Sequence, residues 1–163
     1  MALRPIVKYP DPRLGETCMP VEIFDRDLRQ LADDLLATMR AAPGVGITAA
    51  HIGLPLRLVV LELSPQEAPR FYVNPQIVSA SSDKIRHVEG SVSMPGFTEE
   101  VDRARHVRFR YRDLDGAMHE EDAAGFHAVC IQHEIDQLDG IFWLKRLSRL
   151  KRERLISKWR KQA

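Results

Sequence analysis

The sequence has few cysteines and no long apolar run. Its two cysteines, Cys18 and Cys130, lie far apart in a chain of 163 residues. This does not fit the disulfide framework of a secreted protein and favours a reducing compartment. No segment has the apolar length of a signal sequence or of a membrane span. We therefore expect a cytoplasmic protein that does not insert into membranes.

A strong excess of one charge is also missing. The formal net charge is +1 and 29% of the residues are charged. This composition gives no sign of a nucleic-acid coat, an enzyme for acidic substrates or a disordered chain. A chain of 163 residues has about the length of one domain. The sequence thus predicts a single domain over residues 1–163.

The pattern that is present runs from helix to strands and back to helix. Residues 24–42 carry apolar side chains at helical spacing, with Asp25 as the expected N-cap. Alternating or apolar runs at 56–63, 71–80, 84–96 and 106–116, separated by turn residues, predict strands. From Gly125 the pattern is helical again, and Gly140 is expected to close this helix. The order predicts an α+β domain with mostly antiparallel sheets around a central helix.

The end of the chain is basic. Between Lys145 and Lys161 the sequence has nine basic residues and one acidic residue, Glu153. The spacing predicts a helix at about 148–161, with Leu150, Leu155, Ile156 and Trp159 on its buried side. Such a helix attracts a phosphate-rich partner, although solvated helix faces are often basic as well.

The stretch "QHEIDQLDG" (residues 132–140) carries the strongest chemical signal. It places His133 beside Glu134, as in the pattern His-Glu-x-x-His, where two imidazoles one helical turn apart bind one cation and the Glu moves protons. The second imidazole is replaced here by Gln137. The stretch therefore indicates either a hydrolase with an altered metal site or a hydrolase fold without its chemistry.

Three stretches together resemble the peptide deformylase family. They are "GVGITAAHIG" (44–53), "EGSVSMPG" (89–96) and "QHEIDQLDG", and they match the family's three motifs in order and spacing. The resemblance implies a peptide deformylase-like fold. It also implies an activity that removes formyl from the N-terminal formyl-methionine of new polypeptides, with Fe²⁺ or Zn²⁺ on three protein ligands.

The resemblance also assigns roles to single residues. It implies that Glu134 is the general acid/base and that His51 stands at the oxyanion-hole position. The implied metal positions are Ser91, His133 and Gln137. The implied substrate-binding residues are Gly44, Val45, Gly46, Ile47, Val92, Arg103 and Cys130. For Arg103 a solvent-exposed strand arginine is the alternative. Cys130 is expected to line the pocket wall as a small hydrophobic residue, and a metal ligand is the alternative there.

Two of the three metal positions depart from the family. The family has Cys where Ser91 stands, and a neutral hydroxyl is a poor ligand for iron(II) or zinc. Gln137 offers an uncharged amide oxygen in place of an imidazole, and only His133 is unchanged. The first hypothesis is a deformylase-like protein without effective metal-dependent activity and without a bound cofactor. It would still bind a Met-like N-terminal peptide.

Other hypotheses stay open at this point. His51 stands where the family has Gln, so His51, His133 and Glu134 could form a rearranged Fe²⁺ or Zn²⁺ site of an active deformylase or related amide hydrolase. The simpler interpretation is that His51 hydrogen-bonds Ser91, Gln137 or Glu134 in a metal-free pocket. A third hypothesis, suggested by the family's terminal helix, is a non-catalytic protein that binds the ribosome or the N-terminus of a nascent chain.

Overall fold

The helix α1 (Arg26–Ala41) forms where the apolar spacing predicted it. The computed structural model describes residues 1–162. Asp25 is the N-cap of α1, and its carboxylate accepts a hydrogen bond from the backbone N–H of Leu28 at 3.1 Å. The apolar face of α1 is buried against the first strands: Leu28, Leu31, Ala32, Leu35, Leu36 and Met39.

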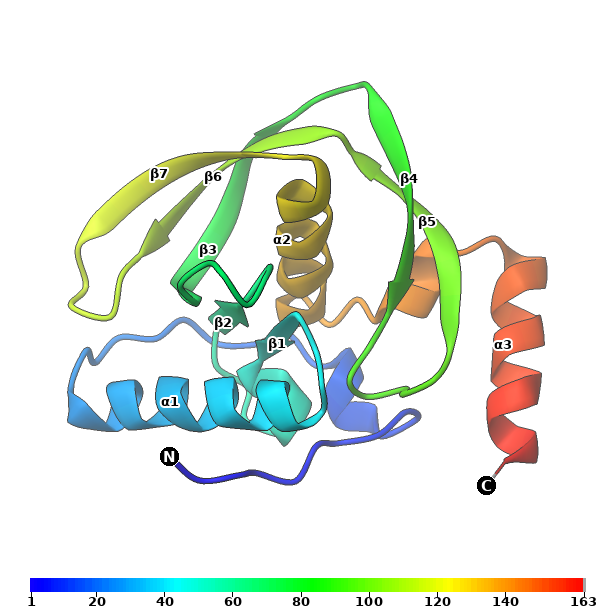
Figure 1. Cartoon of the computed structure of the whole chain (residues 1–163), viewed down its shortest axis with the longest axis horizontal. Coiled ribbons are helices and arrows are strands. Elements are labelled where there is room, and N and C mark those ends of the chain that lie inside the picture. Colours follow the sequence, from blue (N-terminus) through cyan, green and yellow to red (C-terminus); the bar gives the residue numbers. More distant parts are fainter. Residues whose placement is uncertain (163) are drawn as a thin grey trace.

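Within residues 1–162, seven strands form two antiparallel sheets. The larger sheet has the order β1-β2-β3-β6-β7, and β4 pairs with β5 in a separate two-stranded ribbon. The strands are β1 (Gly46–Thr48), β2 (Leu58–Leu61), β3 (Arg70–Ala80), β4 (Lys84–Gly90), β5 (Thr98–Ala104), β6 (His106–Arg112) and β7 (Met118–Ala124). In Figure 1 both sheets curve around the helix α2 (Gly125–Leu138), which lies at the centre of the fold.

Strand β2 separates two apolar clusters. Leu58 and Val60 face the cluster built on α1, whereas Val59 and Leu61 face the cluster built on α2. Because side chains alternate along a strand, a strand covered on both faces is apolar throughout, as this one is. The burial of β2 fixes α1 and α2 on opposite faces of the sheet. The α+β class with mostly antiparallel sheets around a central helix is therefore confirmed.

Some details differ from the sequence-based predictions. The run 84–96 is strand only as far as Gly90, because residues 91–96 turn away from the ribbon. The strands β1, β5 and β7 were not predicted, because β1 has three residues and the other two are rich in charged side chains. Leu150 is 58% exposed and does not join the buried side of its helix.

The glycine after α2 is required by its surroundings. Gly140 has a φ of +76°, a conformation that side chains rarely adopt. A Cβ atom at this position would also lie 2.6 Å from the carbonyl oxygen of Gly15. The end of α2 can therefore approach the N-terminal part of the chain only with glycine at this position.

The first 21 residues, called the leader below, run past several distant elements. The N–H of Val7 donates to the carbonyl of His51 at 2.8 Å, and the N–H of Tyr9 donates to Ser93 at 2.9 Å. The N–H of Cys18 donates to the carbonyl of Leu138 at 2.8 Å. The leader thus contacts all three segments that carry the sequence motifs.

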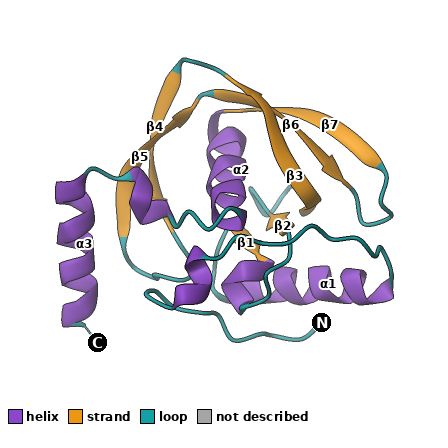
Figure 2. Ribbon diagram, turned by 180° about the vertical axis from the view of Figure 1, so that it is seen from behind, coloured by secondary structure: helices purple, strands orange, loops and turns teal. Residues whose placement is uncertain are grey.

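The last helix, α3 (Arg149–Lys161), stands on the outside of the molecule beside the β4-β5 ribbon (Figure 2). Ser148 is its N-cap and accepts from the N–H of Lys151 at 3.3 Å. The indole N–H of Trp159 donates to the carbonyl of Tyr9 at 2.9 Å, which holds the helix to the leader. Among the helices of residues 1–162, none combines the length and the apolar character that crossing a bilayer requires.

Candidate active site

A cavity of about 430 Å³ brings the three motif segments together. The loop around Gly44, the end of β4 and the first half of α2 form its walls. The lining includes most of the residues that the sequence assigned to a site: Gly44, Val45, Gly46, His51, Ser91, Val92, Cys130, His133 and Glu134. Three others do not line it, namely Ile47, Arg103 and Gln137. Ile47 is instead a core residue with no exposed surface.

His133 is oriented by a buried carboxylate. Its Nδ1 lies 2.8 Å from Oε1 of Glu89, the last residue but one of β4. Burial raises the pKa of Glu89, but the hydrogen bonds from Arg103 and His133 outweigh burial and lower the pKa to about 2. An ionised carboxylate only accepts hydrogen bonds, so the proton of this bond belongs to Nδ1 of His133. Burial lowers the pKa of His133, but the neighbouring carboxylates of Glu134 and Glu89 outweigh burial and raise this pKa above its usual value.

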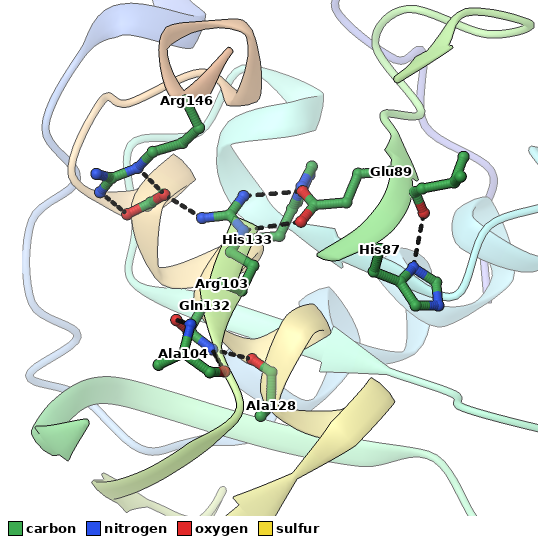
Figure 3. A network of polar contacts seen from close by, with 10 residues as sticks. His87, Glu89, Arg103, Ala104, Ala128, Gln132, His133 and Arg146 are labelled. Carbon is green, nitrogen blue, oxygen red and sulfur yellow. Dashed lines mark hydrogen bonds and ion pairs between the residues drawn. The ribbon is translucent and has the colours of Figure 1, made fainter. Parts of the chain in front are cut away.

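Behind His133 lies a set of charged side chains, called the ion-pair network below: the buried Glu89, Arg103 and Asp136, and the exposed Arg146. Arg103 binds both oxygens of Glu89, through Nε and Nη2, at 2.8 Å each. Its Nη1 lies 2.6 Å from Asp136, and Arg146 binds the same carboxylate twice at 2.8 Å. Figure 3 shows these contacts, which link β4, β5, α2 and the segment before α3. The network holds Glu89, and through it the ring of His133, in one position.

Arg103 therefore does not face a peptide substrate as the resemblance had suggested. Its side chain is 4% exposed, and each of its nitrogen atoms Nε, Nη1 and Nη2 binds a carboxylate. Arg103 is not a solvent-exposed strand arginine either, which was the alternative interpretation. Glu89 and Asp136 stand 14 and 33 residues away in sequence, so no local pattern shows that Arg103 is their partner.

Glu134 is a buried carboxyl group next to His133 on α2. It is 4% exposed, and its Oε1 has no hydrogen-bond partner in residues 1–162. Burial raises the pKa of Glu134 to about 7, although the neighbouring His133 lowers it. A Cβ atom at Gly46 would lie 2.4 Å from Oε2 of Glu134, so the glycine makes room for this carboxyl group. The site thus holds a titratable group that no structural contact explains.

His51 is a neutral imidazole with one free donor. Its Nδ1 accepts a hydrogen bond from the N–H of Thr48 at 2.9 Å. Burial lowers the pKa of His51 to about 3, so the ring is neutral and the proton is on Nε2. Nε2 is buried and has no partner in the described chain. The predicted hydrogen bond from His51 to Ser91, Gln137 or Glu134 does not form, because the ring caps the turn Ala49–Ile52 instead.

The two altered positions make local hydrogen bonds. Oγ of Ser91 accepts from the N–H of Ser93 at 3.1 Å, within the turn that follows β4. Gln137 is 1% exposed, and its Nε2 donates to the carbonyl of Leu14 at 2.7 Å. Ser91 reaches the cavity, whereas Gln137 joins α2 to the leader.

These donors do not fit the metal that the resemblance implies. A neutral hydroxyl and an amide bound to the leader are poor ligands for iron(II) or zinc, which leaves His133 alone among the three positions. Within residues 1–162 no three His, Cys, Asp or Glu side chains are arranged to hold a metal ion. In this part of the chain, His51, His133 and Glu134 are therefore not arranged as such a group.

Some cavity residues were missed by the sequence analysis. Glu89 stood inside a quoted motif, two residues before Ser91, but nothing in the motif shows that it contacts His133, 44 residues further along the chain. His87 and Phe126 also line the cavity, and their ring centroids lie 5.2 Å apart. Cys130 lies in the cavity wall as expected, and burial raises the pKa of its thiol, which disfavours the thiolate form.

Together these features define a class: a small hydrolase fold in which a central helix carries a His-Glu pair into a cavity beside a strand end. The chain belongs to the polypeptide deformylase family, whose model matches residues 3–153. A "Peptide deformylase-like" protein of Agrobacterium fabrum is 63% identical over 161 residues, covering 99% of this chain and 98% of that protein. A "Peptide deformylase" of Afipia carboxidovorans is 46% identical over 166 residues, covering 100% and 97%.

The fold agrees with this assignment. The crystal structure of peptide deformylase from Ehrlichia chaffeensis in complex with actinonin matches with a TM-score of 0.94. The two chains are 35% identical, and the match covers 99% of this chain and 98% of the other.

Proposed function

We propose that this protein is a deformylase-family member that binds the N-terminal segment of a peptide and does not catalyse metal-dependent removal of formyl. The observation that carries the proposal is the pair of hydrogen bonds at Ser91 and Gln137. Ser91 accepts from Ser93, and Gln137 donates to Leu14. Both positions are thus occupied by neutral groups that have structural partners.

Without the positive charge of a metal ion, the site cannot acidify a bound water molecule. A bound metal lowers the pKa of water from about 15.7 to about 7, which supplies hydroxide at neutral pH. Without it Glu134 has no acidified water to deprotonate. A general base alone contributes roughly 10²- to 10⁴-fold, which is far below a typical enzymatic acceleration.

Peptide binding is supported by the shape of the cavity. Its volume of about 430 Å³ lies in the range of small-molecule and peptide sites. Gly44 and Gly46 form one wall, where the absence of side chains lets a ligand backbone approach closely. Val92, Val129 and Phe126 add apolar surface, which suits a Met-like side chain.

The first test compares the natural chain with a variant that restores the family's residues: Ser91→Cys, Gln137→His and His51→Gln together. A new imidazole at position 137 can donate its Nδ1–H to the carbonyl of Leu14, as Gln137 does now. We expect the natural chain, purified anaerobically, to hold little iron or zinc and to release no formate from a formyl-methionyl peptide. The restored variant should bind metal and release formate.

The matched control adds Glu134→Gln to the restored variant, which should keep the metal and lose the activity. Near-stoichiometric iron or zinc in the natural chain, together with formate release, would overturn the proposal. Binding of the free and formylated peptides is measured by calorimetry on the natural chain. Absence of binding to both would refute the peptide-binding part.

A second candidate function rests on α3. Its exposed face carries Arg149, Arg154, Lys158, Arg160 and Lys161, and the helix is held to the rest of the protein by Trp159. A ribosomal surface rich in phosphate would attract this face in a salt-dependent way. Co-sedimentation with ribosomes should weaken when Lys158, Arg160 and Lys161 are changed to Gln. Unchanged co-sedimentation would remove α3 as the contact.

A further inference from the structure

A cluster of polar side chains lies at the first turn of α2, outside the cavity. Its centre is His127, whose side chain is 14% exposed. Nε2 of His127 lies 3.1 Å from the hydroxyl oxygen of Tyr72 on β3 and 3.6 Å from Oε2 of Glu121 on β7. The rings of His127 and Tyr72 are also stacked, with their centroids 6.3 Å apart. His127 thus joins the start of the central helix to two strands of the larger sheet.

The titratable groups that surround this imidazole come from three strands and one loop. They are Arg70 and Tyr72 on β3, Tyr111 on β6, His119 and Glu121 on β7, and Glu67 in the loop before β3. Arg70 donates to Glu121 at 3.2 Å and lies 3.7 Å from Glu67. The hydroxyl of Tyr111 donates to Glu121 at 3.3 Å, and the ring of His119 stacks on Tyr111. The carboxylate of Glu121 is therefore already paired with a guanidinium when the His127 ring is neutral.

The surroundings of His127 favour the neutral ring in the folded protein. Burial and the cation of Arg70 lower the pKa of His127, although the carboxylates of Glu121 and Glu67 raise it. A positive charge in the first turn of a helix also opposes the helix dipole. Burial raises the pKa of the Tyr72 hydroxyl, so Tyr72 keeps its proton. Tyr72 can then donate to Glu121 while it accepts from Nε2–H of the neutral imidazole.

The first turn of α2 connects His127 to the cavity wall. Its N-cap, Ala124, makes no side-chain hydrogen bond, and no acidic residue stands in this turn. The N–H of Gly125 donates to the carbonyl of Arg105 at 3.0 Å. The next residue, Phe126, is 39% exposed and lines the cavity. A change in the contacts of His127 therefore acts on a segment that forms part of the cavity wall.

We propose that His127 is a pH-sensitive switch: its neutral ring holds the first turn of α2 against the sheet, and its protonation releases this turn and the cavity wall. The charged ring is hydrated only when the turn opens, so the open form binds the proton more readily than the closed form. The closed form is therefore favoured above pH 6.5, the usual pKa of a histidine, and loses its advantage as the pH falls below this value. The inference rests on the proposed function in one respect, because its consequence is weaker peptide binding in acid.

The first test measures the opening of the turn by hydrogen exchange of the full chain, without ligand, at about pH 7 and about pH 5. After correction for intrinsic exchange rates, the amides of residues 127–131 should open more readily in acid, by up to about tenfold for each pH unit below 6.5. His127→Gln keeps a donor for Tyr72 but takes up no proton, so this rise should be much smaller. The matched control is His119→Gln, at an exposed histidine of the same sheet, which should behave as the natural chain does. Equal rises in the natural chain and His127→Gln would overturn the inference.

A second measurement needs no variant. The ring of His127 and the backbone amides of residues 126–131 are followed by NMR in the natural chain from about pH 7 to about pH 5. We expect the amide signals to leave their folded positions as the ring takes up its proton, because the two events are linked. If the ring becomes charged while these signals keep their positions, the turn stays closed around an imidazolium and His127 is not a switch.

Calorimetry with a methionyl peptide separates this inference from the proposed function. Between the two pH values the natural chain should lose at least about twofold more affinity than His127→Gln, which corresponds to half of the molecules being open in acid. Peptide binding with the same pH response in both chains overturns the inference and leaves the proposed function intact. A chain whose first turn opens in acid but which binds no peptide at either pH supports the switch and refutes the proposed function.

Discussion

Two groups of polar side chains each include a buried residue of α2, Asp136 in one and Glu134 in the other, and they differ in how well they are paired. In the ion-pair network Glu89 and Asp136 each have two partners. In the adjacent cavity Nε2 of His51 and Oε1 of Glu134 have none within the described residues. A buried polar atom without a partner costs about 1–3 kcal/mol, so the fold bears a cost here that the network avoids. The comparison indicates that the network supports the structure and that the cavity is built for a ligand.

The largest expected effect on stability comes from a change in the ion-pair network. Arg103→Leu leaves Glu89 and Asp136 buried without their shared cation, which should lower the free energy of unfolding by about 3–5 kcal/mol. Urea unfolding followed by circular dichroism measures this change. The control is Arg105→Leu, two positions along the chain, where the exposed pair with Asp83 should contribute no more than about 1 kcal/mol. Equal losses in the two variants would contradict the distinction between a supporting network and surface pairs.

A smaller effect on stability is expected from a change in the cavity, where polar atoms have no partner. Gly46→Ala places a methyl group 2.4 Å from Oε2 of Glu134 and 2.9 Å from Leu61, so Glu134 must move. We expect a loss of about 1–3 kcal/mol in stability, as in other overpacked sites. Affinity for a methionyl peptide should fall as well, as measured by calorimetry. In the control Gly15→Ala the new methyl meets no atom within 4 Å, and both quantities should stay nearly unchanged. If Gly46→Ala binds the peptide as the natural chain does, Glu134 is not part of the peptide-binding site.

The smallest expected effect is on the loss of stability at low pH. The pKa of His51 is about 3 in the folded protein and 6.5 without burial. Between these values the unfolded chain takes up a proton that the folded chain does not, so stability falls as pH falls. The loss is at most about 1.4 kcal/mol per pH unit. His51→Gln should therefore lose less stability than the natural chain between about pH 7 and about pH 5 in urea titrations.

Other groups with shifted pKa values are present in both chains, so their contributions cancel in the comparison; this includes Glu134, whose pKa of about 7 makes the folded chain take up a proton in the same range. Asp34 and Glu89 have pKa values of about 2, so the stability they contribute is lost mainly below the range of the titration. Identical acid sensitivity of the natural chain and His51→Gln would mean that His51 takes up its proton in the folded state. The neutral, unpaired imidazole on which the comparison depends would then be wrong.

The sequence predicted the backbone better than the pairing of side chains. The start of α1 at Asp25, its buried face and the end of α2 at Gly140 were predicted, because each depends on residues that are near one another in sequence. The strand β7, with its sequence "MHEEDAA", has almost no apolar alternation, because it lies at the edge of the sheet and is largely exposed. Local patterns identify elements whose stability is local or whose buried face is apolar.

The site shows the same limit. Ser91, His133 and Gln137 were recognised from motifs, but their hydrogen bonds depend on the tertiary fold. Gln137 pairs with Leu14, which lies 123 residues earlier, and no sequence pattern shows that this amide points away from the cavity. Only the contact of His51 with Thr48, three residues apart, could have been foreseen from a capping-box pattern.

The contacts of the leader affect the order in which the protein can be completed. The leader is synthesised first, yet its partners include Leu138 and Gln137 at the end of α2 and Trp159 in α3. Contacts between positions so distant in sequence form late, since the intervening chain must first exist and fold. The N-terminal residues therefore stay undocked during most of translation. An N-terminal fusion would therefore interfere with the last contacts to form, those of the leader with the end of α2 and with α3.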